Sequence, residues 1–319
     1  MRVEIALLLL LVYLTIATAL DNCLAVDFSD ARRCQGIDFE ASDMMTLPKM
    51  SLADGAKEAA PFSSLPILSS NQSITPTLLL GQNCSASDVS NISVCLSSFN
   101  ITSFLAGLPV AANVSRENCA KVLLDNNNDF NNSSSYHISG FQILNAESGM
   151  YTAYVIDENR SEVLNAAPLL IIEGKIILQT PDKVMSEEPF IQVKMNTTAQ
   201  ENQSKFFAAI MISRRDYENI SLSLSKNESS EYSDLILSMG DKSLLLPFPP
   251  KISSELLMDM LPLLPQNSAV GLQESPQPGV DLILMTDKPW EKGEYILTSA
   301  VYSSAKGLLG IKQNKIEVI

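Results

Sequence analysis

The sequence predicts a mostly β protein made of two tandem immunoglobulin-like Greek-key β-sandwich domains with short helical insertions. Three observations lead to this fold class. Apolar and polar residues alternate along several segments, an acidic-x-Gly-x-Tyr motif occurs once in each half of the chain, and 319 residues exceed the usual length of one domain. Alternation with period two is typical of strands that have one buried and one exposed face.

The alternation is clearest in the second half of the chain. Ile191, Val193 and Met195 are separated by polar residues, and serines separate apolar residues over Ile220–Lys226 in the same way. Leu282 and Leu284 are expected to join Ile191, Val193, Met195, Ile220, Leu222 and Leu224 in the dry faces of one sandwich. Other expected strands lie at Tyr136–Ile138, Phe141–Leu144, Tyr151–Val155, Leu169–Ile172, Lys175–Leu178 and Val280–Met285.

The two copies of the Gly-x-Tyr motif indicate an internal repeat. Residues 147–151 and 291–295 each follow an apolar segment and precede a β-rich one. In Greek-key sandwiches such a turn forms a tyrosine corner, in which the tyrosine hydroxyl bonds back to the backbone near the turn. The predicted structural residues of the two corners are Gly149 with Tyr151 and Gly293 with Tyr295.

The expected organisation has four parts. A signal peptide occupies residues 1–19, an irregular leader residues 20–74, a first sandwich with helical segments residues 75–173, and a second sandwich residues 174–319. Apolar residues at helical spacing and capping residues predict short helices within 88–108, 116–124, 213–218 and 253–261.

The N-terminus is typical of a secretory signal peptide. Arg2 precedes an apolar run from Ile5 to Ala17, and Ala17-Thr-Ala19 supplies the small residues that signal peptidase requires, so the mature chain is expected to begin at Leu20. The alternative is a retained anchor, but the run of about 16 residues is shorter than the roughly 20 that a spanning helix needs. We expect a secreted or cell-envelope protein with no membrane span after cleavage.

Asn-x-Ser/Thr acceptor sites are unusually dense. Twelve occur, none with proline at the middle position, where composition alone predicts about three or four. This density predicts an N-glycosylated extracellular chain. The candidate acceptors are Asn71, Asn83, Asn91, Asn100, Asn113, Asn131, Asn132, Asn159, Asn196, Asn202, Asn219 and Asn227.

The five cysteines are disulfide candidates in a secreted chain. Spacing suggests the pairs Cys23–Cys34 and Cys84–Cys95, which leaves Cys119 over; an equally open choice pairs Cys119 with Cys84 or Cys95. Free buried thiols are a further alternative. A metal site is disfavoured because the sequence has no close Cys-x-x-Cys pair and only one histidine.

Charge and motifs exclude several kinds of activity. A net charge of −14, from 36 acidic and 22 basic residues, argues against nucleic acid or anionic lipid as partner. The one histidine, His137, gives little support to a catalytic triad. Residues 125–129 begin like a calcium loop, but Phe130 stands where glycine is needed and Tyr136 where glutamate is needed. We expect no catalytic residue, no metal and no cofactor.

Several strand-like segments resemble a family known as methanogen extracellular proteins. The resemblance covers roughly residues 78–319 and is structural, so it carries over no functional residue. It implies a secreted or envelope protein of methanogenic archaea whose function is unassigned. The segments that carry it are Gly149–Asp157, Ala167–Ile171, Phe207–Ile212 with Tyr217, Gly293–Leu297 and Gly307–Gln313.

Together, these features favour a non-catalytic glycoprotein of the cell envelope, with envelope or surface-layer proteins as partners. The alternative is a secreted binding module for carbohydrate, peptide or calcium, although the 20 aromatic residues offer no obvious binding platform. A secreted hydrolase comes third, since a pair of carboxylates could act without histidine.

The signal and the acceptor sites make a joint prediction about the mature protein. Intact-mass analysis of native material should find a chain that begins near Leu20 and is heavier than its sequence mass. An unglycosylated chain that retains Met1 would contradict the expected compartment.

Overall fold

The computed structural model divides the chain into two compact units. One comprises Met44–Ser64 and Ile172–Ile319 (the C-terminal unit), and the other comprises Thr18–Asp43 and Leu65–Ile171 (the N-terminal unit). Met1–Ala17, grouped with the first, lies outside the residues that the structure describes. Those residues are 35–39, 43–46, 49–52, 64–70, 76–80, 91–98, 119–121, 135–137, 148–159, 162–201, 203–226, 232–239, 241–247, 263–265, 267–286, 288–303 and 305–319.

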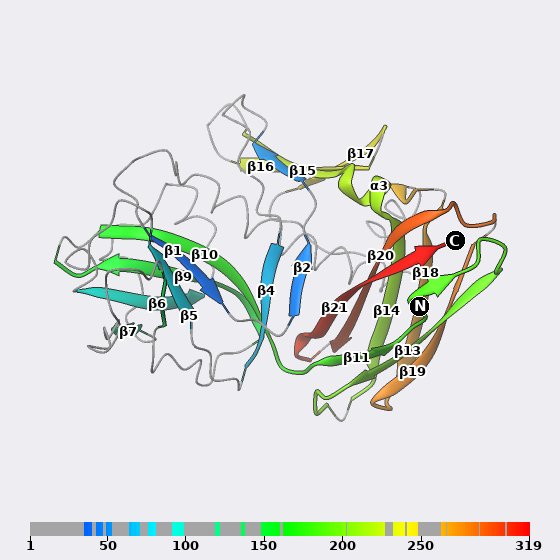
Figure 1. Ribbon diagram of the computed structural model, residues 1–319, viewed down its shortest axis with the longest axis horizontal. Coiled ribbons are helices and arrows are strands. Elements are labelled where there is room, and N and C mark those ends of the chain that lie inside the picture. Colours follow the sequence, from blue (N-terminus) through cyan, green and yellow to red (C-terminus); the bar gives the residue numbers. More distant parts are fainter. Residues whose placement is uncertain are drawn as a thin grey trace. The chain divides into compact units, whose positions relative to one another are not determined.

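The C-terminal unit contains a three-stranded and a five-stranded sheet (Figure 1). The neighbours in both sheets are antiparallel, except that β12 runs parallel to β21. The smaller sheet has the order β11 (Ile176–Gln179), β13 (Phe190–Thr197), β19 (Gly279–Met285). The larger has the order β12 (Lys183–Val184), β21 (Gly307–Val318), β20 (Gly293–Ser303), β14 (Lys205–Ser213), β18 (Ala269–Ser275).

One hydrophobic core joins the two sheets. It contains Ile191, Val193 and Met195 of β13 and Leu282 and Leu284 of β19, as the alternation predicts, together with residues of β14, β20 and β21. Along β13 exposed and buried residues alternate at every position. The period-two pattern therefore identified the strands whose outer face is exposed.

The strands of the N-terminal unit lie in two further sheets. A three-stranded sheet has the order β1 (Gln35–Phe39), β5 (Pro76–Leu80), β8 (Ser135–His137). A six-stranded sheet has the order β2 (Asp43–Thr46), β4 (Ser64–Ser69), β10 (Glu162–Ile172), β9 (Gly149–Asp157), β6 (Ile92–Ser98), β7 (Cys119–Lys121). Met44–Thr46 of β2 are grouped with the C-terminal unit. The expectation of an irregular leader over 20–74 is thus wrong for its described part, where short strands find their partners far along the chain.

The same strand order occurs twice. The order β1-β5-β8 corresponds to β11-β13-β19, and β4-β10-β9-β6-β7 corresponds to β12-β21-β20-β14-β18, with each strand in the same place along its half of the chain. Both copies of the Gly-x-Tyr motif open the long strand of a hairpin, β9 with β10 and β20 with β21. The internal repeat is therefore one of topology as well as of sequence.

Each copy of this order is interrupted once. After β1 the chain forms β2 and β3 (Lys49–Leu52), and after β14 it forms α3 (Arg214–Glu218), β15 (Ile220–Lys226), β16 (Tyr232–Met239) and β17 (Lys242–Pro247). The inserted strands make a four-stranded sheet, β17-β16-β15-β3, in which β3 runs parallel to β15. Ile220, expected in the sandwich with Leu222 and Leu224, is thus at the start of this separate sheet.

Two predicted helices are strands instead. β6 lies within 88–108 and β7 within 116–124. Ile92, Val94 and Leu96 also alternate along the chain, and the β-branched pair favours a strand once β9 and β7 flank it. The turn expected at 213–218 is confirmed: Ser213 caps α3, and its side chain accepts from the amide of Asp216. The helix expected at 253–261 lies outside the described residues.

A disulfide joins two neighbouring strands of the N-terminal unit. Cys95 of β6 and Cys119 of β7 are directly opposite in the sheet and are bonded to each other. The spacing-based pair Cys84–Cys95 is therefore wrong, and one of the open alternatives is correct. Cys23, Cys34 and Cys84 lie outside the described residues.

This crosslink predicts a stability change that is confined to one unit. Cys119→Ser should lower the free energy of unfolding of the N-terminal unit by about 3 kcal/mol, because a bond across 24 residues restricts the unfolded chain. Fluorescence of Trp290, the single tryptophan, reports on the C-terminal unit and should keep its urea midpoint. A circular dichroism transition that does not move, or a fluorescence midpoint that moves with it, would contradict the prediction.

Candidate functional site

The described acceptor asparagines are all on the surface. Asn91, Asn159, Asn196 and Asn219 are each exposed, and they occur in both units. Asn91 precedes β6, Asn159 follows β9, Asn196 is on β13 and Asn219 ends α3. The remaining eight candidates, Asn71, Asn83, Asn100, Asn113, Asn131, Asn132, Asn202 and Asn227, lie outside the described residues.

Two of these asparagines touch each other. The Nδ2 of Asn91 donates a hydrogen bond of 2.6 Å to the Oδ1 of Asn159. The amide of Glu158 also donates to the carbonyl of Asn91, at 2.9 Å. Two acceptor sites that are 68 residues apart in sequence are thereby adjacent at the end of the β6–β9 pair.

The two predicted tyrosine corners differ in structure. Tyr295 is 1 % exposed and packs edge-on against Trp290 with 5.8 Å between ring centroids, whereas Tyr151 is half-buried. Among the described glycines only Gly293 and Gly307 have positive φ, 143° and 76°, so Gly149 does not share the turn conformation of Gly293.

The Tyr295 hydroxyl departs from the prediction. It is buried and has no hydrogen-bond partner among the described residues. Burial raises the pKa of Tyr295, and the backbone of Glu291 lies close enough to oppose that rise without reaching hydrogen-bond geometry. The hydrogen bond predicted for the second tyrosine corner is therefore not formed. The backbone of Glu291, four residues before Tyr295, nevertheless lies near the hydroxyl, where the partner was expected.

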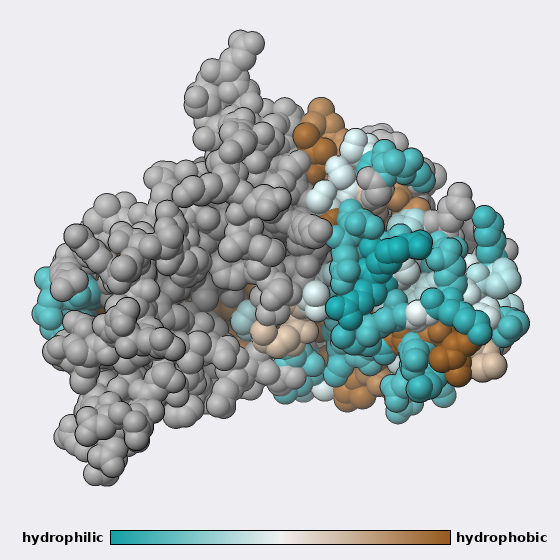
Figure 2. Space-filling view, turned by 45° about the horizontal axis from the view of Figure 1, so that its top comes forward, coloured by the Kyte–Doolittle hydropathy of each residue, from teal (hydrophilic) through white to brown (hydrophobic). Residues whose placement is uncertain are grey.

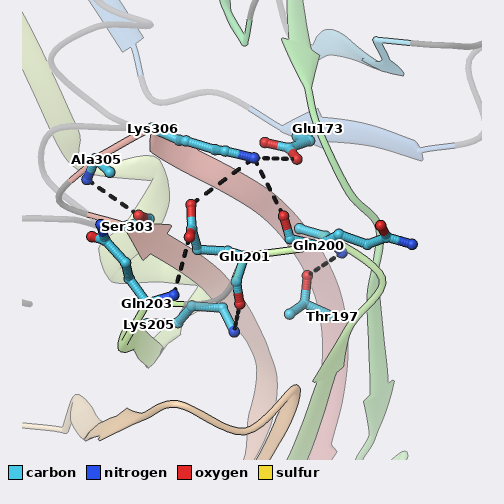
Figure 3. A network of polar contacts seen from close by, with 10 residues as sticks. Glu173, Thr197, Gln200, Glu201, Gln203, Lys205, Ser303, Ala305 and Lys306 are labelled. Atoms are coloured by element: carbon cyan, nitrogen blue, oxygen red, sulfur yellow. Dashed lines mark hydrogen bonds and ion pairs between the residues drawn. The ribbon is translucent and has the colours of Figure 1, made fainter.

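A polar network ties together the loops at one end of the C-terminal unit (Figure 3). The ammonium of Lys306 donates to Glu173 Oε1 at 2.8 Å and to the carbonyl of Gln200 at 3.3 Å. Lys205 is 2 % exposed, and its ammonium donates to the carbonyls of Glu201 at 2.7 Å and Pro276 at 3.3 Å. Two lysines thus hold the β13–β14 loop to the neighbouring turns.

This network is suited to holding loops and not to proton transfer. The hydrogen bond to Glu173 raises the pKa of Lys306, so its ammonium stays charged at neutral pH. The Glu201 carboxylate accepts from the Gln203 amide at 3.1 Å and lies 4.0 Å from Lys306. Within the part of the chain that the structure describes, no three metal-ligating side chains come together.

Apolar side chains gather on the outer face of the smaller sheet. Phe190 of β13 pairs across the strands with Met285 of β19, and Ile283 lies two residues along on the same face. Their exposed fractions are 49 %, 67 % and 55 %. We call these three residues the outer apolar strip. Elsewhere the visible surface of the C-terminal unit is largely hydrophilic, with a few brown apolar patches (Figure 2).

A second contact surface holds the β2 strand. The side-chain amide of Gln313, on β21, accepts from the Thr46 amide at 2.9 Å and donates to the Thr46 carbonyl at 3.3 Å. The hydroxyl of Tyr217, on α3, donates to the same carbonyl. Gln313 also donates to Tyr217 Oη at 3.1 Å and to Thr298 Oγ1 at 3.2 Å. No sequence signal marks this cluster, because its members come from four separate elements.

The residues considered for other chemistry are structural or undescribed. His137 is the last residue of β8. Trp290 is 2 % exposed, and its indole N–H donates to the carbonyl of Glu188 at 2.9 Å, so it packs inside the unit. The calcium-like segment 125–129 lies outside the described residues. No helix in the described part is long and apolar enough to cross a membrane.

Comparison with known proteins gives no family. No family model and no curated protein matches the sequence. Among solved structures, latent PorU from Porphyromonas gingivalis matches at 8 % identity and a TM-score of 0.22, over 92 % of this chain and 21 % of that one. This chain thus spans about a fifth of that protein.

Two further structures are similar at the same level. The fibronectin(III)-like modules of Clostridium thermocellum CbhA match at 9 % identity and a TM-score of 0.20, over 89 % of this chain and 94 % of that one. The Yersinia pseudotuberculosis adhesin InvE matches at 10 % identity and a TM-score of 0.19, over 79 % and 56 %. All are too distant to assign an activity.

Two buried tyrosines of the C-terminal unit, Tyr217 and Tyr295, provide a matched pair of substitutions. Tyr217→Phe should destabilise the C-terminal unit by about 1–2 kcal/mol, because it removes the hydrogen bonds that the hydroxyl of this buried residue forms with the Thr46 carbonyl and the Gln313 side chain. Tyr295→Phe should be neutral or stabilising by up to about 1 kcal/mol, because its hydroxyl is buried without a partner. Urea unfolding followed by fluorescence measures both; an equal loss from Tyr295→Phe would restore the tyrosine-corner interpretation.

Proposed function

We propose that this protein is a non-catalytic secreted glycoprotein of the archaeal cell envelope, with a structural or interaction role at the surface layer. The observation that carries the proposal is the exposure of all four described acceptor asparagines across both units. A glycan attached to any of them would extend into solvent without disturbing a core. An envelope protein gains bulk, solubility and protease resistance from such a coat.

The finer fold that fits this role is a tandem pair of immunoglobulin-like Greek-key sandwiches, the first built from β1 and β4 to β10 and the second from β11 to β14 and β18 to β21. In such a sandwich the strands A, B and E share one sheet and C, F and G the other. The order β11-β13-β19 beside β21-β20-β14 supports this assignment, and β5-β8 beside β10-β9-β6 supports it for the first copy. Rigid sandwiches in tandem are suited to spacing and presenting surfaces.

The described polar groups support a role without catalysis. The buried ammonium of Lys205 and the side chain of Lys306 are both committed to loop contacts. The acidic residue of the second repeat motif, Glu291, lies 3.4 Å from Arg215 at the surface. None of these contacts leaves a nucleophile beside a base. The acidic net charge favours protein partners over nucleic acid or anionic lipid.

The alternative is a secreted binding module for carbohydrate, peptide or calcium. The outer apolar strip favours peptide or protein among these ligands, because three large apolar side chains remain half-exposed on one sheet face. A secreted hydrolase is the third candidate, and converging carboxylates in a cleft would be needed to support it.

Glycan mapping of native protein tests the proposal directly. The protein should be recovered from the envelope or medium fraction, with glycan on at least one of Asn91, Asn159, Asn196 and Asn219. The matched control is Asn267, a partly exposed asparagine in a turn outside any acceptor site, which should be unmodified. A cytosolic chain with all four asparagines bare would contradict the proposed function.

A further inference from the structure

The adjacent acceptors Asn91 and Asn159 are matched in exposure but differ in their relation to the sheet. Both are exposed, and the Nδ2 of Asn91 donates to the Oδ1 of Asn159, so the two side-chain amides lie at one place on the surface. Asn159 follows the end of β9, where Asp157 forms the last backbone pair with Glu162 of β10; residues 160 and 161 lie outside the described residues. Asn91, in contrast, leads directly into β6.

The hydroxyl group of the Asn91 acceptor is buried. The acceptor motif requires a serine or threonine two residues after the asparagine, so a transferase must reach that hydroxyl as well as the amide. For Asn91 the hydroxyl belongs to Ser93, which is 2 % exposed. Exposure of the asparagine alone therefore does not make this acceptor usable in the folded chain.

Pairing on both edges of β6 holds Ser93 in the sheet. On one edge Ser93 lies opposite Ile156 of β9, and on the other it lies opposite Lys121 of β7. The Cys95–Cys119 disulfide ties β7 to β6 two residues further along. The chain can therefore present Ser93 to an enzyme only by breaking its ladder to a neighbouring strand. This is a local unfolding step, and the open form is a small fraction of the molecules.

We propose that folding closes the Asn91 acceptor, so that it is glycosylated only on chains in which β6 is not yet paired. The reaction is glycosyl transfer from a phosphate-activated sugar. A bond forms between the anomeric carbon of the sugar and Nδ2 of Asn91, and Nδ2 gives up one proton to a base of the transferase. The bond from that carbon to the phosphate oxygen breaks, and its electron pair leaves with the phosphate.

The neighbouring acceptor stays open after folding. Asn159 lies beyond the last pair of the β9–β10 ladder, and no described residue accepts a hydrogen bond from its Nδ2. This order of events rests on the proposed glycosylation and deepens it, because it assigns each of the two acceptors to a stage. A glycan on Asn91 of the native protein would record modification before folding, whereas one on Asn159 is possible at either stage.

Glycosylation of the folded chain in vitro tests this order. The full chain, made without glycans and with its disulfide intact, is incubated with a soluble N-glycosyltransferase and a nucleotide-activated sugar. Peptides of residues 87–94 and 155–164 give the rate of each acceptor without a fold. Relative to its peptide, Asn91 should react at least about a hundredfold more slowly in the folded chain, because only the open form reacts, whereas Asn159 should lose less than about tenfold. Mass spectrometry of the digested product measures both rates.

The Cys119→Ser variant should change only one of the two rates. Without the disulfide β7 separates from β6 more readily, so the rate at Asn91 should rise at least about tenfold while the rate at Asn159 stays constant. If this variant does not fold, urea below the unfolding transition of the wild type should raise the rate at Asn91 in the same way.

Two results would overturn the proposal. One is an equal ratio of folded-chain rate to peptide rate at the two acceptors, and the other is a rate at Asn91 that neither Cys119→Ser nor urea raises. Enzyme and sugar are added to an unmodified chain, so these results do not depend on whether the native protein is glycosylated. Glycan mapping of native protein decides that question separately.

Discussion

Burial of β14 and β20 on both faces is the constraint on which the C-terminal unit depends. β14 is buried at all nine positions except Phe206, which is partly exposed, and β20 is buried from Tyr295 to Val301. Strands buried on both sides must be near-continuously apolar and must pair on both edges. β14 meets this requirement by pairing with β18 and β20, and β20 by pairing with β14 and β21. The rest of the unit is arranged around this pair.

Sequence reasoning recovered the features that short-range pattern determines. The alternation at Ile191–Met195, the helical turn at 213–218 and the strands that follow the repeated Gly-x-Tyr motif were all predicted, because each is encoded within a few residues. β6 was misread as a helix because Ile92 and Leu96 fit both periods, and only the partners β7 and β9 decide between them. The contact between Gln313 and Thr46 was unpredictable, since it joins residues 267 apart in sequence.

The polar groups of the C-terminal unit share one physical role. Three side chains donate to backbone carbonyls of neighbouring segments: Lys205, Lys306 and Gln313. Their hydrogen bonds therefore hold loops and strands in place. The acceptor asparagines lie outside these contacts, on exposed strands and turns. A scaffold whose loops and strands are fixed by such contacts, with the acceptor asparagines exposed, is consistent with the proposed role at the cell surface.

Hydrogen exchange of the Cys119→Ser protein, read by mass spectrometry, tests most directly whether the fold consists of two repeats with β3 belonging to the second. Loss of the disulfide should speed exchange in β6 and β9, which share its sheet. Amides of residues 49–52 should instead keep the wild-type rate, together with those of β15. Faster exchange of residues 49–52 in step with β6 and β9 would contradict the account.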